Sequence, residues 1–185
     1  MIWGDEKLQN LIDIGMICNT YEGSVNPASI NLRLGHTFLK PVPGQTIMLG
    51  EEMQYRRFDL DDRETIAIGT GEFMLATTIE AVAVPINAAA FVQGRSSIGR
   101  AALSVQNAGF VDPGFHGHIT LELKNEGPCT LLLYPGYPVT QLVYMDATHV
   151  TKPYSGKYNG QVEATGSRMQ LDGITPDSAF GKELG

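Results

Sequence analysis

The chain contains little cysteine and little positive charge. Of its 185 residues only Cys18 and Cys129 are cysteines, and 13 lysines and arginines compare with 20 aspartates and glutamates. Two cysteines far apart in sequence argue against a disulfide framework and a structural zinc site, and they suit a reducing cytoplasm. A net charge of −7 argues against nucleic acid as a partner, so a phosphate site would have to be a local cluster of basic side chains.

Long apolar runs are also missing. No apolar stretch approaches the ~20 residues that a membrane-spanning helix needs. The first ten residues, MIWGDEKLQN, lack the basic segment and apolar core of a secretory signal. Hydrophobic residues make up 43% of the chain and charged residues 18%, which is typical of a globular protein with one core. We therefore expect a single globular unit in the cytoplasm without a membrane partner.

Short β-type runs separated by turn residues dominate the chain. The 21 glycines and 10 prolines are spread widely and separate these runs. The runs are residues 29–35, 45–50, 64–69, 72–84, 88–94, 118–125, 129–134 and 139–145. Only residues 5–14 have helical spacing, with Leu8 and Leu11 on one face. Gly15 can end this helix. We predict an all-β sandwich, barrel or jelly roll with one short N-terminal helix.

The composition changes near residue 150. Residues 151–185 are polar, rich in glycine and serine, and almost without apolar periodicity. Such a segment does not contribute a face to the core. We therefore predict a β domain over residues 1–150 and a C-terminal lid or tail over residues 151–185.

The strand predicted over residues 117–125 alternates between apolar and polar side chains. Ile119, Leu121 and Leu123 share one face, and Glu122 lies on the other. On a solvated face, Glu122 is an ordinary surface carboxylate. If another subunit or the lid covers this face, Glu122 is a candidate general base. The alternation alone leaves both interpretations open.

A turn precedes this strand. Asp112, Pro113 and Gly114 are a strong turn signal, and Phe115 follows them. The simplest interpretation is a hairpin corner with Phe115 in the core. Alternatively, Asp112 and Phe115 lie at the mouth of a loop, where the aromatic ring stacks on a sugar or a base.

The stretch FVQGRSSIGRAAL, residues 91–103, places two arginines and two serines around one turn. Arg95, Arg100 and the two hydroxyls between them suit a polyphosphate, although a solvated surface turn explains them equally well. The spacing fits neither a P-loop nor the G-x-S-x-G turn of serine hydrolases.

His116 and His118 are two residues apart, so in a strand they share a face and could both bind a metal. A third ligand is not evident, and the other histidines, His36 and His149, are remote in sequence. The paired motifs H-x-E and P-C-x-x-C of the zinc nucleobase deaminases are absent as well. We therefore predict no zinc and no metal held by protein side chains.

Six segments follow one another in an order that a known family shares. They are VNPASINLRLG (25–35), FMLATTIEAVAVP (73–85), GRSSIGR (94–100), AGFVDPGFHGHITLELKN (108–125), LYPGYPVTQL (133–142) and PYSGKYNGQ (153–161). Over roughly residues 5–165 the chain therefore resembles the dCTP deaminase branch of the dUTPase-like superfamily.

The resemblance implies a dUTPase-like β-clip, which is a distorted jelly-roll barrel, closed by a C-terminal lid. It also implies a homotrimer with active sites at subunit interfaces, and a nucleotide that brings Mg²⁺ with its triphosphate. The implied reaction is zinc-independent hydrolysis of dCTP to dUTP and ammonia, which feeds dUMP and dTTP synthesis. The family ties the loop between Arg100 and Asp112 to feedback by dTTP, so dTTP is an expected inhibitor.

By position, Glu122 matches the family's catalytic carboxylate, which takes a proton from the attacking water. Arg100 and Ser96 match the residues that hold this water and orient the carboxylate. Arg95, Ser96 and Ser97 match the contacts to the triphosphate.

Further positions match contacts to the sugar, the base and the closed lid. Asp112 matches the group that binds the deoxyribose 3′-hydroxyl, and Phe115 matches the aromatic ring beneath the sugar. Backbone groups near Ala108 and Thr120 match those that recognise the base. The lid positions that match are Tyr154, Lys157 and Gln161.

Three other functions remain open at this point. A bifunctional enzyme would deaminate dCTP and then cleave dUTP to dUMP and pyrophosphate, and Gly99 and residues 108–115 resemble such members. A plain dUTPase would carry G-R-S-G and an arginine-containing C-terminal motif, whereas this chain has G-R-S-S. An inactive nucleotide-binding homologue would not need to retain Glu122, Arg100 and Ser96.

Overall fold

The computed structural model describes residues 1–106 and 109–174. In chain order its elements are α1 (Asp5–Asp13), β1 (Ile17–Cys18), β2 (Val25–Asn26), β3 (Ser29–Pro41), β4 (Tyr55–Asp59), β5 (Ile66–Ile68), β6 (Phe73–Ala83), β7 (Ala88–Gly94), α2 (Ser96–Arg100), β8 (Leu103–Gln106), β9 (Phe110–Val111), β10 (His116–Asn125), β11 (Leu131–Leu133), β12 (Pro138–Asp146) and the 3₁₀ helix η1 (Met169–Asp172). The all-β prediction is confirmed. No helix within the described residues is long and apolar enough to cross a membrane.

The N-terminal helix forms where the apolar spacing predicts it. Leu8 and Leu11 on α1 are buried in the core, as expected from their shared face. Asp5 and Glu6 lie in the first turn, where the partial positive charge of the helix end favours carboxylates. Gly15 follows the helix with a φ of 75°, a conformation that glycine adopts without steric cost.

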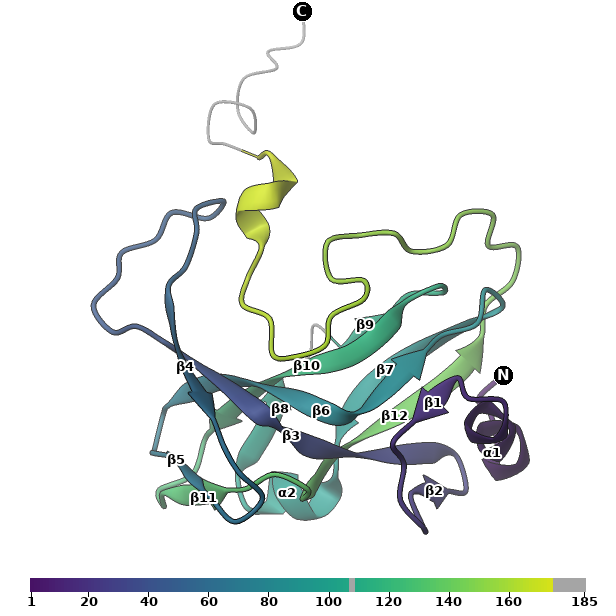
Figure 1. The fold of residues 1–185 in the computed structure, drawn as a ribbon, viewed down its shortest axis with the longest axis horizontal. Coiled ribbons are helices and arrows are strands. Elements are labelled where there is room, and N and C mark those ends of the chain that lie inside the picture. The colour runs from purple at the N-terminus through teal and green to yellow at the C-terminus, as the bar shows by residue number, and fades with distance from the viewer. Residues whose placement is uncertain (107–108, 175–185) are drawn as a thin grey trace, which may run out of the picture.

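Ten strands form one antiparallel sheet that curls around the core (Figure 1). Its main path runs β8-β10-β6-β3-β12-β7-β9, and β1, β2 and β4 pair with its two longest strands. β5 and β11 form a separate two-stranded sheet. The enclosed core is one cluster, and it includes the fully buried Phe38, Leu121 and Tyr144.

The strand β10 alternates as predicted. Ile119, Leu121 and Leu123 are buried, and Glu122 is half-buried on the opposite face. β6 lies along most of one edge of β10, whereas β8 pairs only with residues 122–125 of the other edge. The first half of that second edge is therefore available to another segment.

The strand expected over residues 45–50 is not formed. The side-chain amide of Gln45 donates to the carbonyl oxygens of Val42 and Gln54, at 2.7 and 2.9 Å, and its oxygen accepts a bond from the Gln54 N–H. These bonds close a loop in which the apolar side chains of Met48 and Leu49 remain exposed. An apolar run becomes a strand only where a neighbouring edge and a core are available to it.

The elements β4 and α2 were not predicted. β4 has the polar sequence YRRFD and pairs as an edge strand with β3, and Phe58 is its side chain that packs against the core. Because little of β4 is buried, its composition is polar, as is typical of a loop. Residues 96–100, which were expected to form a turn, form one turn of helix.

Gly35 lies where β3 passes β6 without space for a side chain. A Cβ there would lie 2.4 Å from Cγ2 of Thr77 and 3.2 Å from the carbonyl oxygen of Thr78. We expect Gly35→Ala to lower the free energy of unfolding by about 1–3 kcal/mol, because the two strands must move apart. The matched control is Gly99→Ala on α2, where a Cβ would point into open space within the described structure. Urea denaturation measures both variants, and equal midpoints would contradict this close contact.

Candidate active site

The predicted phosphate site lies at the end of β7, where the chain enters α2. Ile98 is buried and anchors the helix, while Ser96, Ser97 and Arg100 are exposed. Within the part of the chain that the structure describes, no hydrogen bond uses the side chains of these three exposed residues. Arg95 is half-buried, and its guanidinium donates to the carbonyl oxygen of Pro138 at 2.9 Å. The hydroxyls and the Arg100 guanidinium therefore remain available to an anion.

The predicted sugar site lies at the turn between β9 and β10. Asp112 is exposed, and its carbonyl oxygen accepts a bond from the N–H of Phe115 at 3.1 Å, which confirms the predicted turn. Phe115 is buried and belongs to the core, so within this chain it has the role of the simpler interpretation. Its ring centroid lies 6.2 Å from that of Tyr154, which packs on it from the C-terminal segment.

The predicted catalytic carboxylate projects from the polar face of β10. Glu122 pairs with Leu75 of β6 and Gln106 of β8 through the backbone. Within the described residues no hydrogen bond or ion pair involves its side chain. Thr120, on the same face, donates a hydrogen bond of 3.3 Å to the side-chain oxygen of Gln161. Ala108, expected near the base, lies outside the described residues.

The C-terminal segment fills the edge of β10 that β8 leaves free. After β12 it crosses the sheet, descends to β10 and rises again beside the loop between β3 and β4 (Figure 1). The N–H of Gly160 donates to the carbonyl oxygen of His116, and the N–H of His118 donates to that of Gln161, both at 2.8 Å. A Cβ on Gly117 would lie 2.7 Å from the Gln161 oxygen, so glycine is required for this approach. The segment thus pairs with β10 at His116 and at His118, which lies four residues before Glu122.

The segment is closed on itself around Lys157. The ammonium group of Lys157 forms an ion pair with Asp172 on η1, and the guanidinium of Arg168 donates to the Lys157 carbonyl oxygen. The hydroxyl of Tyr158 accepts a bond from the Arg168 N–H at 3.1 Å. Residues 157–172 therefore form a compact loop. Gln161 in this loop contacts Thr120, and Tyr154 just before it packs on Phe115, whereas the ammonium group of Lys157 is paired with Asp172.

Sequence reasoning missed the partners of this loop on β4. Arg57 forms two hydrogen bonds of 2.7 Å to Glu163, one from each terminal nitrogen, and its Nε donates to Asp59. The hydroxyl of Tyr55 accepts a bond of 3.2 Å from the N–H of Ser167. The arginine bonds hold the pKa of the Glu163 carboxyl below its ordinary value. No sequence pattern connects β4 to a segment more than one hundred residues later.

The chain brings these residues together in two groups rather than one. Val111 pairs with Ala90 of β7, so Asp112 lies near Ala89, whereas Arg95 follows the other end of the same strand. Six residues of strand separate the two positions, which is about 20 Å. Asp112, which is predicted to bind the sugar, and Arg95, which is predicted to bind the triphosphate, therefore lie at opposite ends of β7.

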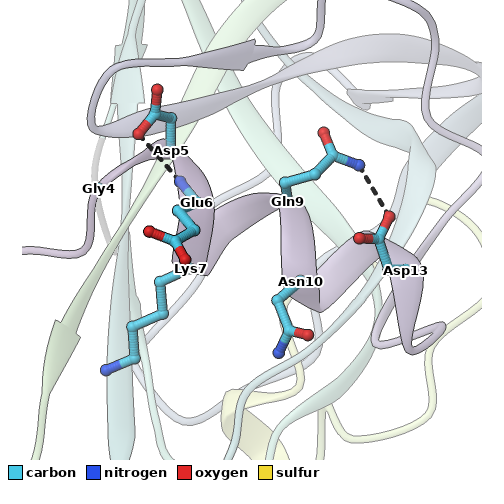
Figure 2. A pocket seen from close by; sticks show the side chains of 7 residues that line it. All are labelled: Gly4, Asp5, Glu6, Lys7, Gln9, Asn10 and Asp13. Atoms are coloured by element: carbon cyan, nitrogen blue, oxygen red, sulfur yellow. Dashed lines mark hydrogen bonds between the residues drawn. The ribbon is translucent and has the colours of Figure 1, made fainter.

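A shallow polar hollow beside α1 contains none of the predicted site residues. Gly4, Asp5 and Lys7 line it, together with the exposed face of the helix (Figure 2). Gln9 donates to Asp13 along the same face at 3.0 Å. These polar groups satisfy one another or contact solvent, and this hollow is not the candidate active site.

The Arg57–Glu163 pair predicts a pH-dependent attachment of the loop. Because the pKa of Glu163 is lowered by the pair, the attachment is complete above the ordinary value of 4.5 and is lost as the pH falls through the folded-state value. We expect Glu163→Gln to mobilise residues 160–166 already at neutral pH, as measured by ¹⁵N relaxation of their amides. The control is Glu126→Gln, an exposed carboxylate for which the described structure shows no ion pair. An equally rigid loop in both variants would contradict this role of the pair.

Comparison with known proteins agrees with the geometry. Residues 2–147 match the family model described as dCTP deaminase-like. Proteins named "dCTP deaminase, dUMP-forming" from Sulfurihydrogenibium sp. (strain YO3AOP1) and Persephonella marina are each 39% identical to this chain, over 93% of it and 99% of their own length.

A solved structure supports the fold. The crystal structure of 2′-deoxycytidine 5′-triphosphate deaminase from Agrobacterium tumefaciens superposes with a TM-score of 0.65 at 20% identity, over 79% of this chain and 48% of that chain. At this identity the likeness shows the architecture alone, and it confirms the fold that the six sequence segments predicted. The family match covers most of the chain and the two relatives cover almost all of it. This chain therefore belongs to the dCTP deaminase-like family.

Proposed function

We propose that this protein hydrolyses dCTP to dUTP and ammonia. The observation that carries the proposal is the half-buried Glu122, which lies on the face of β10 next to Thr120 and Gln161 and has no described side-chain partner. A carboxylate in such a position is free to accept a proton, which is what a general base requires. The match of residues 2–147 to the dCTP deaminase-like family supports the choice of substrate.

The chemistry uses the residues as follows. Glu122 takes a proton from a water held by Ser96 and Arg100, and the oxygen of that water bonds to C4 of the cytosine. The carboxylate passes this proton to N3 of the ring. It then takes the second proton from the hydroxyl on C4 and passes it to the amine, so that the C4 oxygen becomes the carbonyl of the uracil ring as the carbon–nitrogen bond breaks. Ammonia then leaves with the broken carbon–nitrogen bond. General base catalysis contributes roughly 10²–10⁴-fold, and holding the water in line with C4 adds a proximity effect.

The nucleotide is held by the remaining predicted residues. Arg95, Ser96 and Ser97 bind the triphosphate, and Asp112 binds the 3′-hydroxyl. Backbone groups near Ala108 and Thr120 recognise the base, and the ring of Phe115 supports the sugar from its buried position.

The loop of residues 157–172 acts as the lid. The ammonium group of Lys157 forms an ion pair with Asp172 in the described structure. A bound triphosphate carries more negative charge than this one carboxylate, so Lys157 would bind the triphosphate instead. Tyr154 and Gln161 close the site beside Thr120. Exclusion of bulk water by this loop would strengthen the electrostatic interactions within the site.

Magnesium enters with the substrate. The polar side chains of α2 are the hydroxyls of Ser96 and Ser97 and the guanidinium of Arg100, a set that suits phosphate oxygens. The described residues contain no group of three histidine, cysteine, aspartate or glutamate side chains placed to hold a metal. Mg²⁺ would therefore bind through the triphosphate, where it offsets charge that a chain of net charge −7 would otherwise repel. Zinc has no part in the proposed reaction.

A second candidate activity extends the first. The two relatives at 39% identity are named dUMP-forming, which favours cleavage of the dUTP to dUMP and pyrophosphate in the same protein. Asp112 would then help to place a water at the α-phosphate.

The free state of both cysteines, Cys18 and Cys129, fits the reducing cytoplasm where nucleotide synthesis takes place.

A product assay tests both candidates. We expect pure protein with dCTP and Mg²⁺ to release ammonia. The variant Glu122→Gln should still bind dCTP but release no ammonia, because the amide cannot accept the proton. Intact dUTP as the final product would limit the protein to deamination, whereas dUMP and pyrophosphate from both dCTP and dUTP would establish the second step. Absence of turnover of either nucleotide would refute both candidates and leave a nucleotide-binding protein. Addition of dTTP to the same assay tests the expected inhibition.

The separation of about 20 Å between Asp112 and Arg95 supports a site shared by two chains. A nucleotide that contacted both residues of one chain would have to extend along most of β7. We therefore propose a homotrimer. In it, the triphosphate-binding residues Arg95, Ser96 and Ser97 of one subunit face the residues of the next subunit that bind the sugar and the base.

Mixing two inactive partners tests this arrangement. We expect Arg95→Ala and Asp112→Ala each to lower kcat/KM for dCTP, and coexpression of the two variants to restore part of it. Mixed oligomers contain some sites that combine the intact Arg95 of one subunit with the intact Asp112 of another. If each site belonged to a single chain, every site would still carry one substitution and coexpression would restore nothing. Analytical ultracentrifugation of the same samples determines the number of subunits.

A further inference from the structure

The pairing of β10 with β6 is interrupted next to the candidate site. His118 pairs with Ala81 and Thr120 pairs with Thr77, so three residues of β6 face the single residue Ile119 of β10. An irregularity of this kind is a β-bulge, and bulges often set the direction of a side chain beside an active site. Glu122 lies three residues beyond Ile119 on the same strand.

The side chain of Thr78 replaces the backbone bond that the bulge removes. Its hydroxyl oxygen accepts a bond of 3.0 Å from the N–H of Ile119 and donates a bond of 2.8 Å to the carbonyl oxygen of Glu80. The carbonyl oxygen of Thr78 also lies 2.9 Å from Nδ1 of His118. Thr78 is 1% exposed, so solvent cannot replace these bonds. One hydroxyl thus connects the two strands at the point where their ladder is broken.

The β6 side of the bulge is held by a buried charge. The carboxylate of Glu80 is fully buried and accepts bonds of 2.7 Å from both the backbone N–H and Nε of Arg33 on β3. Because these bonds tie the bulge to β3, β6 cannot shift along its axis to relieve the irregularity. Any loss of the Thr78 hydroxyl must be accommodated by movement of β10.

The bulge determines where Glu122 lies. In the structure Glu122 faces Leu75, whereas extension of the regular pairing of residues 116–118 would place it opposite Thr77. This difference of two residues is about 7 Å along the strand, and it would leave Glu122 on the same face. We infer that Thr78 is a positioning residue for Glu122, because its hydroxyl holds the second half of β10 in the register that the carboxylate needs. The inference rests on the proposed deamination.

Removal of the hydroxyl alone tests the inference. We expect Thr78→Val, which has nearly the same shape, to lower kcat for dCTP by roughly 10²-fold, since displacements of about 1 Å at a reacting group have effects of this size. KM for dCTP should change less than kcat, because the proposed triphosphate contacts of Arg95, Ser96 and Ser97 lie outside β10, whereas only the proposed base contacts near Thr120 move together with Glu122. Thr78→Ser retains the hydroxyl and should restore most of kcat.

Three further measurements separate positioning from stability. Leu11→Ala removes a buried side chain of α1, which belongs to neither strand of the bulge, and below its melting temperature it should retain the kcat of the wild type. If Leu11→Ala loses as much kcat as Thr78→Val, the effect is one of stability and the inference is wrong. If Thr78→Ser is as slow as Thr78→Val, the hydroxyl is not responsible. If Thr78→Val does not fold, Thr78→Cys takes its place, and a wild-type kcat in that variant would overturn the inference.

The outcome is distinguishable from failure of the proposed function. Wild-type protein that releases no ammonia from dCTP refutes the deamination itself. Wild-type protein that releases ammonia, together with a Thr78→Val variant of equal kcat, refutes only the role of Thr78.

Discussion

The buried carboxylate of Glu80 is the constraint on which the centre of the sheet depends. It has no access to water, and its charge is compensated by the backbone and the guanidinium of Arg33. Removal of one partner of such a pair typically costs about 3–5 kcal/mol, because the other charge remains buried. The Arg33 guanidinium also donates to the carbonyl oxygen of Asn19 and lies over the ring of Tyr21, 4.8 Å from its centroid. One ion pair therefore joins β3, β6 and the loop that follows β1.

From this centre the constraint extends to the candidate site. β6 is the neighbour of both β3 and β10, so the irregular pairing around Thr78 determines how the polar face of β10 is presented. The free edge of β10 then needs a partner for its backbone groups, and the segment around Gln161 supplies one. The position of this segment thus follows from the same requirement as the sheet, which is that backbone polar groups find partners.

The charge distribution explains how an acidic protein can bind a nucleotide triphosphate. The net charge of −7 is spread over the surface, whereas Arg95 and Arg100 are concentrated at one short helix. Local guanidinium groups and hydroxyls outweigh a distant excess of carboxylates, because screening in physiological salt limits charge interactions to about 8 Å. The length of β7 separates this helix from Asp112.

The sequence alone determined the all-β class, the N-terminal helix, the alternation of β10 and the turn at Asp112, because each depends on local periodicity or turn chemistry. Its six ordered segments also identified the family and hence the candidate residues. The sequence could not show that residues 45–50 form a loop, that the polar YRRFD forms a strand, or that Arg57 binds Glu163. Those outcomes depend on which edges and surfaces are free after the sheet has formed. Likewise, only the tertiary structure decided that Thr78 completes the bulge near Glu122. Its hydroxyl is needed because the backbone pairing of β6 and β10, two strands distant in sequence, is interrupted there.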